Sequence, residues 1–184
     1  MALRRYVVAV DRSSRSGLEV EVFSVVVVDI GEQNHLIRYS DFFKHMRKLG
    51  LQKRIYVPKM LKLISELIDR HIIVGLRVFT RLDSVVEIVH SRGAAILACV
   101  VDDNIYRYHT SNSRRASDYL KNIQLVLLES TLKKPGRELI EKTHRVGLKM
   151  VTLRTVMKIS DNIANYTRNI LEDQLKKIPQ IWKL

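Results

Sequence analysis

The first forty residues alternate between apolar runs and polar turns, as antiparallel strands do. An apolar strand is predicted over residues 5–10, followed by Asp11 and a polar turn that contains Gly17. A second strand is predicted over residues 18–30, and after another turn a short third strand over residues 35–39. The chain is therefore expected to open as an antiparallel meander of two long strands and one short strand.

After residue 39 the apolar spacing changes from two to about 3.6, the period of an α-helix. Ser40 is a predicted N-cap for a helix over residues 41–49, with Gly50 just past its end. Pro58 suits the first position of a second helix that runs through Asp69. The apolar stripe of this second helix consists of Met60, Leu61, Ile64, Leu67 and Ile68.

From residue 72 onward, apolar segments with the length of strands alternate with helical segments. The predicted strands are 72–76, 94–101, 123–128 and 148–153, and the predicted helices are 80–93, 111–122, 135–147 and a closing helix at about 155–177. Alternation of this kind is typical of a largely parallel sheet covered on both faces. The predicted fold is therefore α/β, with N-terminal antiparallel strands leading into a mixed, largely parallel sheet that has helices on both faces.

Composition fits one globular domain over residues 1–184, since 46% of the residues are hydrophobic and 28% are charged, with no Pro/Gly/Ser-rich linker. The longest apolar runs are far shorter than the roughly 20 residues that cross a bilayer, and the first residues lack a signal-peptide pattern. We therefore expect a cytoplasmic protein without a membrane partner. Cys99, the single cysteine, is expected to be a buried thiol, and the 6 histidines show no zinc-binding spacing.

Charge is the strongest compositional signal. The chain has 32 Lys and Arg against 19 Asp and Glu, a formal net charge of +13 and a pI near 10.0. Such a field favours polyanionic partners, because lysine and arginine that neutralise phosphates release condensed counterions. Nucleic acid, either DNA or RNA, is the expected partner, and the alternative is a thermophile or ribosome-rich background that tolerates basic surfaces.

Several carboxylates directly follow predicted strands. They are Asp11, Asp102, Asp103 and Glu129. Function in parallel sheets gathers outside the carboxyl ends of the strands, and clustered carboxylates repel one another unless a cation is present. Mg²⁺ takes one or two carboxylates together with substrate phosphate oxygens, so a metal set of Asp11, Asp103 and Glu129 would suit phosphodiester hydrolysis.

Each of these carboxylates also has a purely structural interpretation. Asp102 and Asp103 precede Asn104 in what is also a turn sequence. Glu129 has an alternative as the partner of a lysine, and Asp11 as an ion-pair partner of the neighbouring Arg12.

The order of predicted elements, together with the segment Val-Ala-Val-Asp11-Arg-Ser-Ser, resembles the ribonuclease H-like superfamily over roughly the first 130 residues. A Rossmann-like arrangement is the other architecture considered. The resemblance implies a Mg²⁺-dependent nuclease in which Asp11, then Asp102 or Asp103, and Asp161 on the closing helix are the acidic residues. The sequence departs from the family pattern because the strand at 72–76 ends without an acid and two extra βα units follow.

Two further segments combine positive charge with groups that bind nucleic acid. The loop from Ser130 into the helix after Pro135 offers Ser130, Thr131, Lys133, Lys134 and Arg137 beside free backbone N–H groups, which favours a phosphate. The other segment interleaves Tyr106 and Tyr108 with Arg114 and Arg115, a combination that stacks unpaired bases. A solvated helix entrance and tyrosines packed on the sheet are the respective alternatives.

Three functional hypotheses follow. The first is a basic nucleic-acid-binding α/β protein. The second is a Mg²⁺-dependent nuclease in which Asp11, one of Asp102 and Asp103, and Glu129 or Asp161 hold the metal. The third is a protein-interaction or assembly subunit, since the apolar stripe of the closing helix is available for a homodimer as well as for docking on the sheet. That stripe consists of Val156, Ile159, Ile163, Tyr166 and Ile170.

Overall fold

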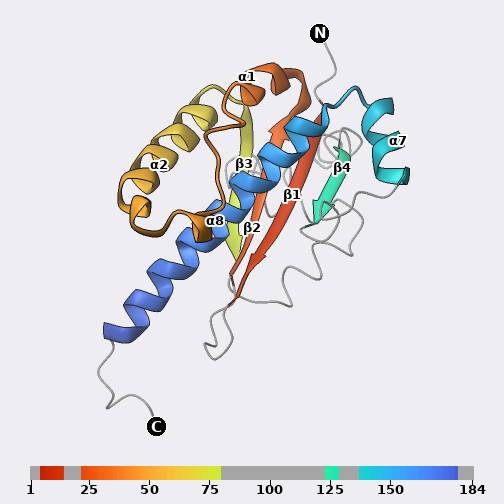
Figure 1. Ribbon diagram of the computed structural model, residues 1–184. Helices are drawn as coiled ribbons and strands as arrows, with labels where there is room; N and C mark the ends of the chain where they lie inside the picture. Colours follow the sequence, from red (N-terminus) through yellow and green to blue (C-terminus); the bar gives the residue numbers. More distant parts are fainter. Residues whose placement is uncertain (1–4, 15–21, 80–122, 129–136, 178–184) are drawn as a thin grey trace, which may run out of the picture.

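A computed structural model of the chain describes residues 5–14, 22–79, 123–128 and 137–177 (Figure 1). These residues form a mixed α/β fold in which helices pack on a four-stranded sheet. The predicted elements between residues 80 and 122 lie outside the described residues. Within the described part of the chain, no helix combines the length and apolar character that crossing a membrane requires.

The sheet has the strand order β3-β2-β1-β4, with β1 (Tyr6–Ser13) and β2 (Val22–Asp29) in the middle. β3 (Ile73–Phe79) pairs antiparallel with β2, and β1 pairs antiparallel with β2. β4 (Ile123–Leu128) pairs parallel with β1 and has the predicted bounds. The antiparallel opening is thus confirmed for two strands. The largely parallel sheet is not confirmed, because two of the three described pairings are antiparallel.

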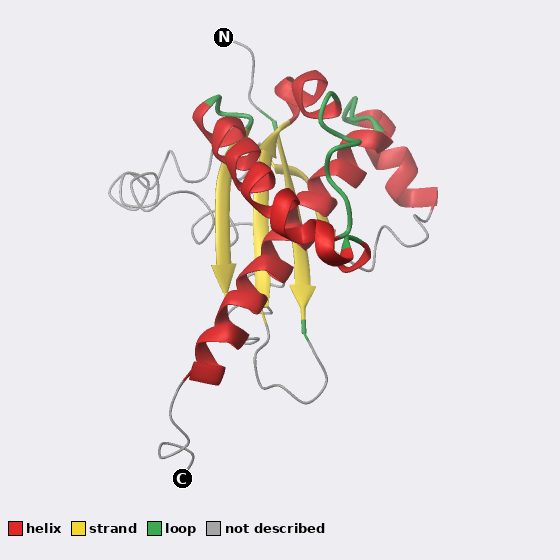
Figure 2. Cartoon of the chain, turned by 60° about the vertical axis from the view of Figure 1, so that its left-hand side comes forward, coloured by secondary structure: helices red, strands yellow, loops and turns green. Residues whose placement is uncertain are grey.

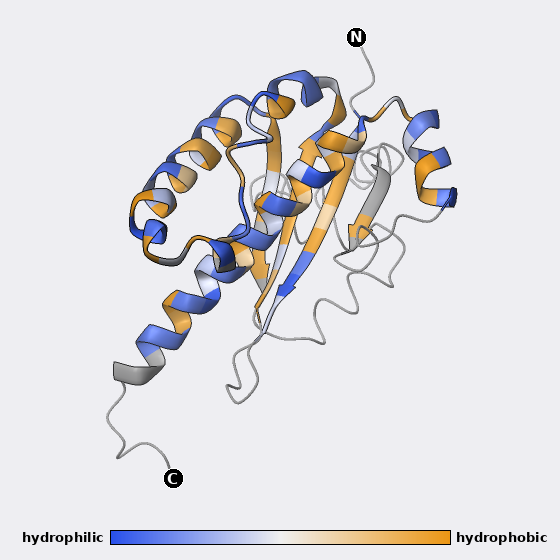
Figure 3. Cartoon of the chain, viewed as in Figure 1, coloured by the Kyte–Doolittle hydropathy of each residue, from blue (hydrophilic) through white to orange (hydrophobic). Residues whose placement is uncertain are grey.

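The two central strands are rich in valine, and all of their residues except Arg12 are buried, on both faces of the sheet. Val7 and Ala9 face the main core together with Val26 and Val28, whereas Val8 points to the opposite face and is fully buried as well. β-branched side chains suit a pleated sheet that is covered on both sides, which explains the near-continuous apolar run in β2. Toward its C-terminal end β1 changes from hydrophobic to hydrophilic residues (Figure 3).

In the described part of the chain, two long helices and several short ones accompany the sheet. The short ones are the 3₁₀ turns η1 (Ile30–Glu32), η2 (Met46–Lys48) and η3 (Gly50–Gln52) and the helices α1 (Gln33–Ile37) and α7 (Arg137–Arg145). The long ones are α2 (Lys53–Asp69) and α8 (Met150–Lys177). α8 crosses the sheet obliquely and contacts β1, β2 and β3 as well as α1 (Figure 2).

The predicted third strand over residues 35–39 is wrong, because this segment belongs to α1 and the turn after it. At the end of β2, the Asp29 carboxylate accepts a hydrogen bond from the backbone N–H of Gly31 at 2.9 Å and so caps η1. This cap directs the chain into helical turns, and Leu36 then points into the core. The edge of β2 is taken by β3 instead.

The predicted helix over residues 41–49 is also wrong. Only η2 is helical there, and residues 41–45 form a turn and an irregular stretch. The aromatic side chains decide the conformation, because Phe43 is fully buried and Phe42 stacks on Tyr56 of α2, with ring centroids 5.4 Å apart. Gly50 has a φ of 48°, the left-handed conformation expected for the glycine at this position.

α2 begins five residues before the predicted start at Pro58, which lies inside the helix. Pro58 is exposed, so the backbone carbonyl at Arg54 that it leaves without a helical donor is on the solvent side. Of the predicted stripe, Met60, Ile64 and Leu67 are buried, Leu61 is half-buried and Ile68 is exposed.

The predicted strand over residues 148–153 is wrong, because α8 already begins at Met150. Gly147, with a φ of 70°, ends the preceding helical turn as predicted. Val151 is exposed and Leu153 is buried, which fits a helix, because side chains two residues apart point to opposite sides of a helix but to the same side of a strand. The closing helix itself is confirmed, and its Val156, Ile159 and Ile163 are buried against the sheet.

Truncation of Met60 tests the packing of the core between α2, α8 and the sheet. Met60 is fully buried, so Met60→Ala is expected to lower the free energy of unfolding by about 2–5 kcal/mol. Urea unfolding followed by circular dichroism measures this. The neighbouring exposed Lys59→Ala is the matched control and is expected to change stability by less than about 0.5 kcal/mol. Equal losses in both variants would contradict this packing.

Candidate functional site

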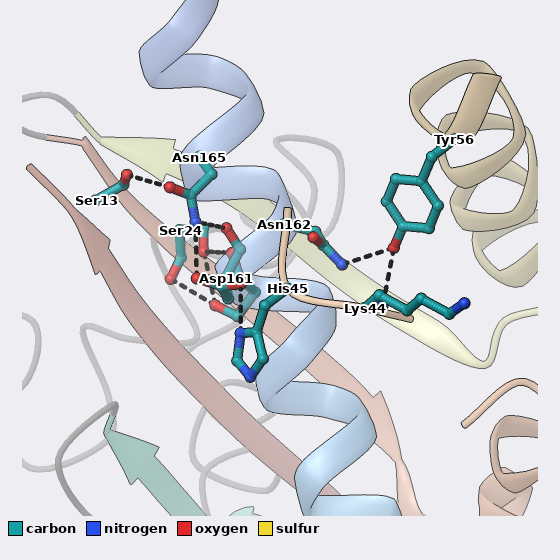
Figure 4. A network of polar contacts seen from close by, with 9 residues as sticks. Ser13, Ser24, Lys44, His45, Tyr56, Asp161, Asn162 and Asn165 are labelled. Atoms are coloured by element: carbon teal, nitrogen blue, oxygen red, sulfur yellow. Dashed lines mark hydrogen bonds and ion pairs between the residues drawn. The ribbon is translucent and has the colours of Figure 1, made fainter. Parts of the chain in front are cut away.

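A layer of polar side chains is buried where α8 crosses β1 and β2 (Figure 4). The Ser24 hydroxyl of β2 lies 2.6 Å from both the carbonyl oxygen and the hydroxyl of Ser160 on α8. The Ser13 hydroxyl of β1 donates to Oδ1 of Asn165 at 2.9 Å. Burying polar groups is costly unless they are hydrogen-bonded, so these pairs hold α8 at one position along the sheet.

Asp11 belongs to the same layer. It is 3% exposed and is paired with Ser24 across the antiparallel strands, so both side chains point to the sheet face that carries α8. Further along α8, Arg168 donates to the carbonyl oxygen of Ser14 at 3.2 Å. The end of β1 is therefore lined by polar groups from α8.

A chain of hydrogen bonds connects this buried layer to the surface. Asp161 of α8 lies between His45 and Asn165: its Oδ2 is 3.1 Å from Nδ1 of His45, and its Oδ1 accepts from Nδ2 of Asn165 at 2.7 Å. An ionised carboxylate only accepts hydrogen bonds, so Nδ1 of His45 carries the proton. The other ring nitrogen, Nε2, points away from Asp161 (Figure 4).

Tyr56 of α2 fixes the segment that carries His45. The phenolic oxygen accepts hydrogen bonds from Nδ2 of Asn162 at 3.0 Å and from the backbone N–H of Lys44 at 3.2 Å. Burial raises the pKa of the Tyr56 phenol, because it disfavours the phenolate, and the hydrogen bonds from Lys44 and Asn162 oppose part of this rise. α2, α8 and the segment before η2 thus meet at one hydroxyl.

Beside His45 lies a pocket with a volume of about 400 Å³. Its walls come from the segment between α1 and α2 and from one residue of α8. The lining residues are Asp41, Phe43, Lys44, His45, Lys48, Leu49, Gln52 and Lys158. Lysines thus line the pocket from parts of the chain more than one hundred residues apart, and an anion is the ligand that this charge favours.

Three of the site residues predicted from sequence are described. Asp11 and Asp161 lie on β1 and α8, and Arg137 is exposed at the start of α7, where its Nε lies 3.0 Å from Oε1 of Glu141. The others lie outside the described residues. They are Asp102, Asp103, Tyr106, Tyr108, Arg114, Arg115, Glu129, Ser130, Thr131, Lys133 and Lys134.

A metal site is not present within the described ranges, where no three His, Cys, Asp or Glu side chains come together. Of the predicted metal set, only Asp11 lies in these ranges, whereas Asp103 and Glu129 do not. The predicted Mg²⁺ site therefore stays a prediction.

The sequence interpretation missed His45, Lys158 and the buried polar residues of α8. The sequence did contain an indication of the buried polar residues, since Asn162 and Asn165 lie in the turns of α8 that also carry its apolar stripe. Polar residues on a buried helix face indicate partners elsewhere in the fold. The contact of His45 with Asp161 spans 116 residues, and spacing in the sequence carries no such information.

Tyr56→Phe tests the role of the shared hydroxyl. The variant leaves the amide of Asn162 and the N–H of Lys44 without their acceptor, so stability is expected to fall by about 1–3 kcal/mol at neutral pH. Because burial raises the pKa of Tyr56 in the folded state, wild-type stability is retained below the ordinary tyrosine pKa of 10.0 and falls as the pH rises through the folded-state value.

Tyr56→Phe lacks this titration, so its stability deficit is expected to shrink above pH ~10. Thermal melts of both proteins across pH ~8 to ~11 measure the difference. Tyr39→Phe, at a half-buried tyrosine with no hydroxyl hydrogen bond among the described residues, is the control. A deficit that stays constant with pH would contradict the assigned role of burial.

Comparison of this chain with protein-family models, with curated proteins and with solved structures finds no match.

Proposed function

We propose that this protein binds nucleic acid through the basic segment, residues 38–62, which runs from the end of α1 into α2. Charge concentration carries the proposal, because this stretch contains one acidic residue, Asp41, and more than half of the formal net charge of +13. Its basic residues are Arg38, Lys44, Arg47, Lys48, Lys53, Arg54, Lys59 and Lys62. A field of this density attracts phosphates and gains affinity from counterion release.

The packing of the basic segment leaves most of its charge in solvent. Met60 and Ile64 point into the core from one side of α2, and Lys59 and Lys62 are exposed on the other side. Before α2, Lys44 and Lys48 are exposed around the pocket. Lysine and arginine in such positions contact phosphates without reading bases, so we expect affinity with little sequence preference.

Two exposed aliphatic side chains lie among the lysines and arginines of the basic segment. Leu51 in η3 is 92% exposed, and Ile55, four residues later in the first turn of α2, is 66% exposed. Exposed apolar side chains amid lysine and arginine suit the sugar and base surfaces of an unpaired strand better than a duplex backbone. Single-stranded nucleic acid is therefore the favoured polymer state.

A Mg²⁺-dependent nuclease is the second candidate function, and the register between β1 and β4 favours it. Val10, the residue before Asp11, is paired with Leu128, the residue before Glu129 in the sequence. Parallel strands that reach the same edge in this register suit two carboxylates at one end of the sheet. Mg²⁺ held there would supply an activated water for phosphodiester hydrolysis.

The binding proposal predicts a salt-dependent affinity that resides in the basic segment. In a titration of labelled single-stranded RNA and DNA, the logarithm of the association constant is expected to fall linearly with the logarithm of salt concentration. The triple variant Arg54→Gln/Lys59→Gln/Lys62→Gln is expected to reduce this slope by about two, at about 0.7 per lost phosphate contact.

A matched variant removes the same charge elsewhere. Arg70→Gln/Arg145→Gln/Arg154→Gln changes three exposed arginines outside the basic segment, and we expect its slope to stay within about one of wild type. Equal losses in both triple variants would assign binding to net charge alone. Absence of salt-sensitive binding in the wild type would overturn the proposal and favour a protein partner or an assembly role.

The nuclease candidate predicts cleavage of labelled single- or double-stranded DNA or RNA in the presence of Mg²⁺ or Mn²⁺. Asp11→Asn keeps the size of the buried side chain but removes its charge, so cleavage is expected to fall by at least about 100-fold while binding is retained. Asp69→Asn, on the exposed side of α2, is the control. No cleavage by the wild type with either metal rules out this candidate.

A further inference from the structure

The pocket beside His45 has a charge that suits one particular kind of anion. Lys44, Lys48 and Lys158 line it together with a single carboxylate, that of Asp41. Positive charges around one pocket repel one another, and a bound anion lowers this cost. Counted with Asp41, they amount to about two net positive charges, which matches the charge of about −1.5 to −2 on a phosphate monoester at neutral pH.

The donor groups around the pocket are held from different elements. Lys158 of α8 is half-buried, and its Nζ lies 3.4 Å from the carbonyl oxygen of Ser40. An ammonium group has three donors, so this contact leaves others for a ligand. Lys44 is held through its backbone N–H by the hydroxyl of Tyr56, so its backbone is fixed beside the pocket while its side chain points away from His45 (Figure 4).

His45 adds an oriented donor or acceptor. Asp161 holds its Nδ1, and Asp161 is itself held by Asn165, whose Oδ1 accepts from the hydroxyl of Ser13. This chain fixes the ring orientation and the tautomer, as a carboxylate does for many functional histidines. Because Nδ1 is engaged, Nε2 is the polar atom that His45 offers to a ligand in the pocket.

The remaining walls favour a ligand with an apolar part next to the phosphate. Phe43 and Leu49 line the pocket, and Gln52 adds an amide. A volume of about 400 Å³ is at the small end of ligand pockets and suits a group of about the size of one nucleotide. A terminal nucleotide of a nucleic acid and a free mononucleotide share this chemistry.

We propose that this pocket binds a phosphate monoester of a nucleotide, held by Lys48, Lys158 and Nε2 of His45, with the charge of Lys44 adding to the positive field around the pocket. The inference rests on the proposed nucleic-acid binding, which it deepens: the basic segment holds the polymer and the pocket recognises its phosphorylated end. A phosphodiester within a strand carries only one negative charge and matches the pocket less well.

Binding of oligonucleotides that differ only at their ends tests this assignment. One single-stranded sequence with an internal fluorescent label is prepared with a 5′-phosphate, a 3′-phosphate or hydroxyls at both ends, and anisotropy is measured in EDTA to prevent cleavage. One phosphorylated end is expected to bind about tenfold more tightly than the hydroxyl form. Adenosine monophosphate is expected to remove the extra affinity of the phosphorylated oligonucleotide and to leave binding of the hydroxyl form unchanged.

Two variants in the pocket locate the effect. Lys44→Gln/Lys48→Gln is expected to abolish the end preference, and His45→Asn, which keeps a donor toward Asp161 but removes Nε2, is expected to reduce it about threefold or more. Lys59→Gln/Lys62→Gln removes as much charge from the exposed side of α2, away from the pocket lining. This control is expected to weaken all three oligonucleotides while keeping their ratio.

The outcomes separate the two proposals. Oligonucleotides that bind equally well with and without a terminal phosphate would overturn the pocket assignment and leave nucleic-acid binding intact. If adenosine monophosphate binds in a way that depends on Lys44 and Lys48 but no oligonucleotide binds, the result would support phosphate binding in the pocket and overturn the proposed nucleic-acid binding. An end preference lost equally in the Lys59→Gln/Lys62→Gln control would also overturn the pocket assignment.

Discussion

The fold depends on how α8 satisfies the polar groups that it buries against β1 and β2. Ser24 meets Ser160, and Ser13 meets Asn165, at distances below 3 Å. Apolar contacts such as those of Val156 and Ile159 tolerate small shifts, but a shift of one helical turn would break every one of these hydrogen bonds. The polar layer therefore selects one register for a helix whose apolar residues alone would permit several.

The register of α8 also determines where the segment between α1 and α2 packs on its outer side. Asp161 and Asn162 each reach out to the segment between α1 and α2, through His45 and Tyr56 respectively. This segment has little regular secondary structure, yet two of its aromatic residues are anchored: Phe43 is fully buried and Phe42 stacks on Tyr56. A few aromatic and polar anchors thus hold a stretch that would otherwise be specified weakly.

The same segment, residues 38–52, has four Lys or Arg residues and one acidic residue, so like-charge repulsion opposes its ordered packing. Lysines gathered around one pocket repel one another, and this repulsion opposes the folded arrangement. Burial of Phe43 and the hydrogen bonds to Tyr56 offset the cost locally. With an anionic ligand in the pocket, the electrostatic energy of these lysines would change from unfavourable to favourable. The same arrangement of charges thus opposes folding without a ligand and would favour the proposed binding.

The sequence by itself determined the elements whose periodicity is long or unambiguous. β4 has its predicted bounds, the valine-rich β1 and β2 pair antiparallel as expected, and the closing helix is present. The net charge of +13 was likewise legible, because composition is a property of the chain alone, whereas Asp11, predicted to follow the first strand, lies within β1.

Only the tertiary structure decided the short segments and the site. Residues 35–39 and 148–153 have patterns that fit a strand or a helix, and the choice depended on the Asp29 cap and on the core available to Leu36 and Leu153. The pocket joins Lys48 to Lys158, and the polar chain joins His45 to Asp161. Local periodicity specifies which face of an element is buried but not its partner, so contacts across more than one hundred residues had to come from the packing of α8.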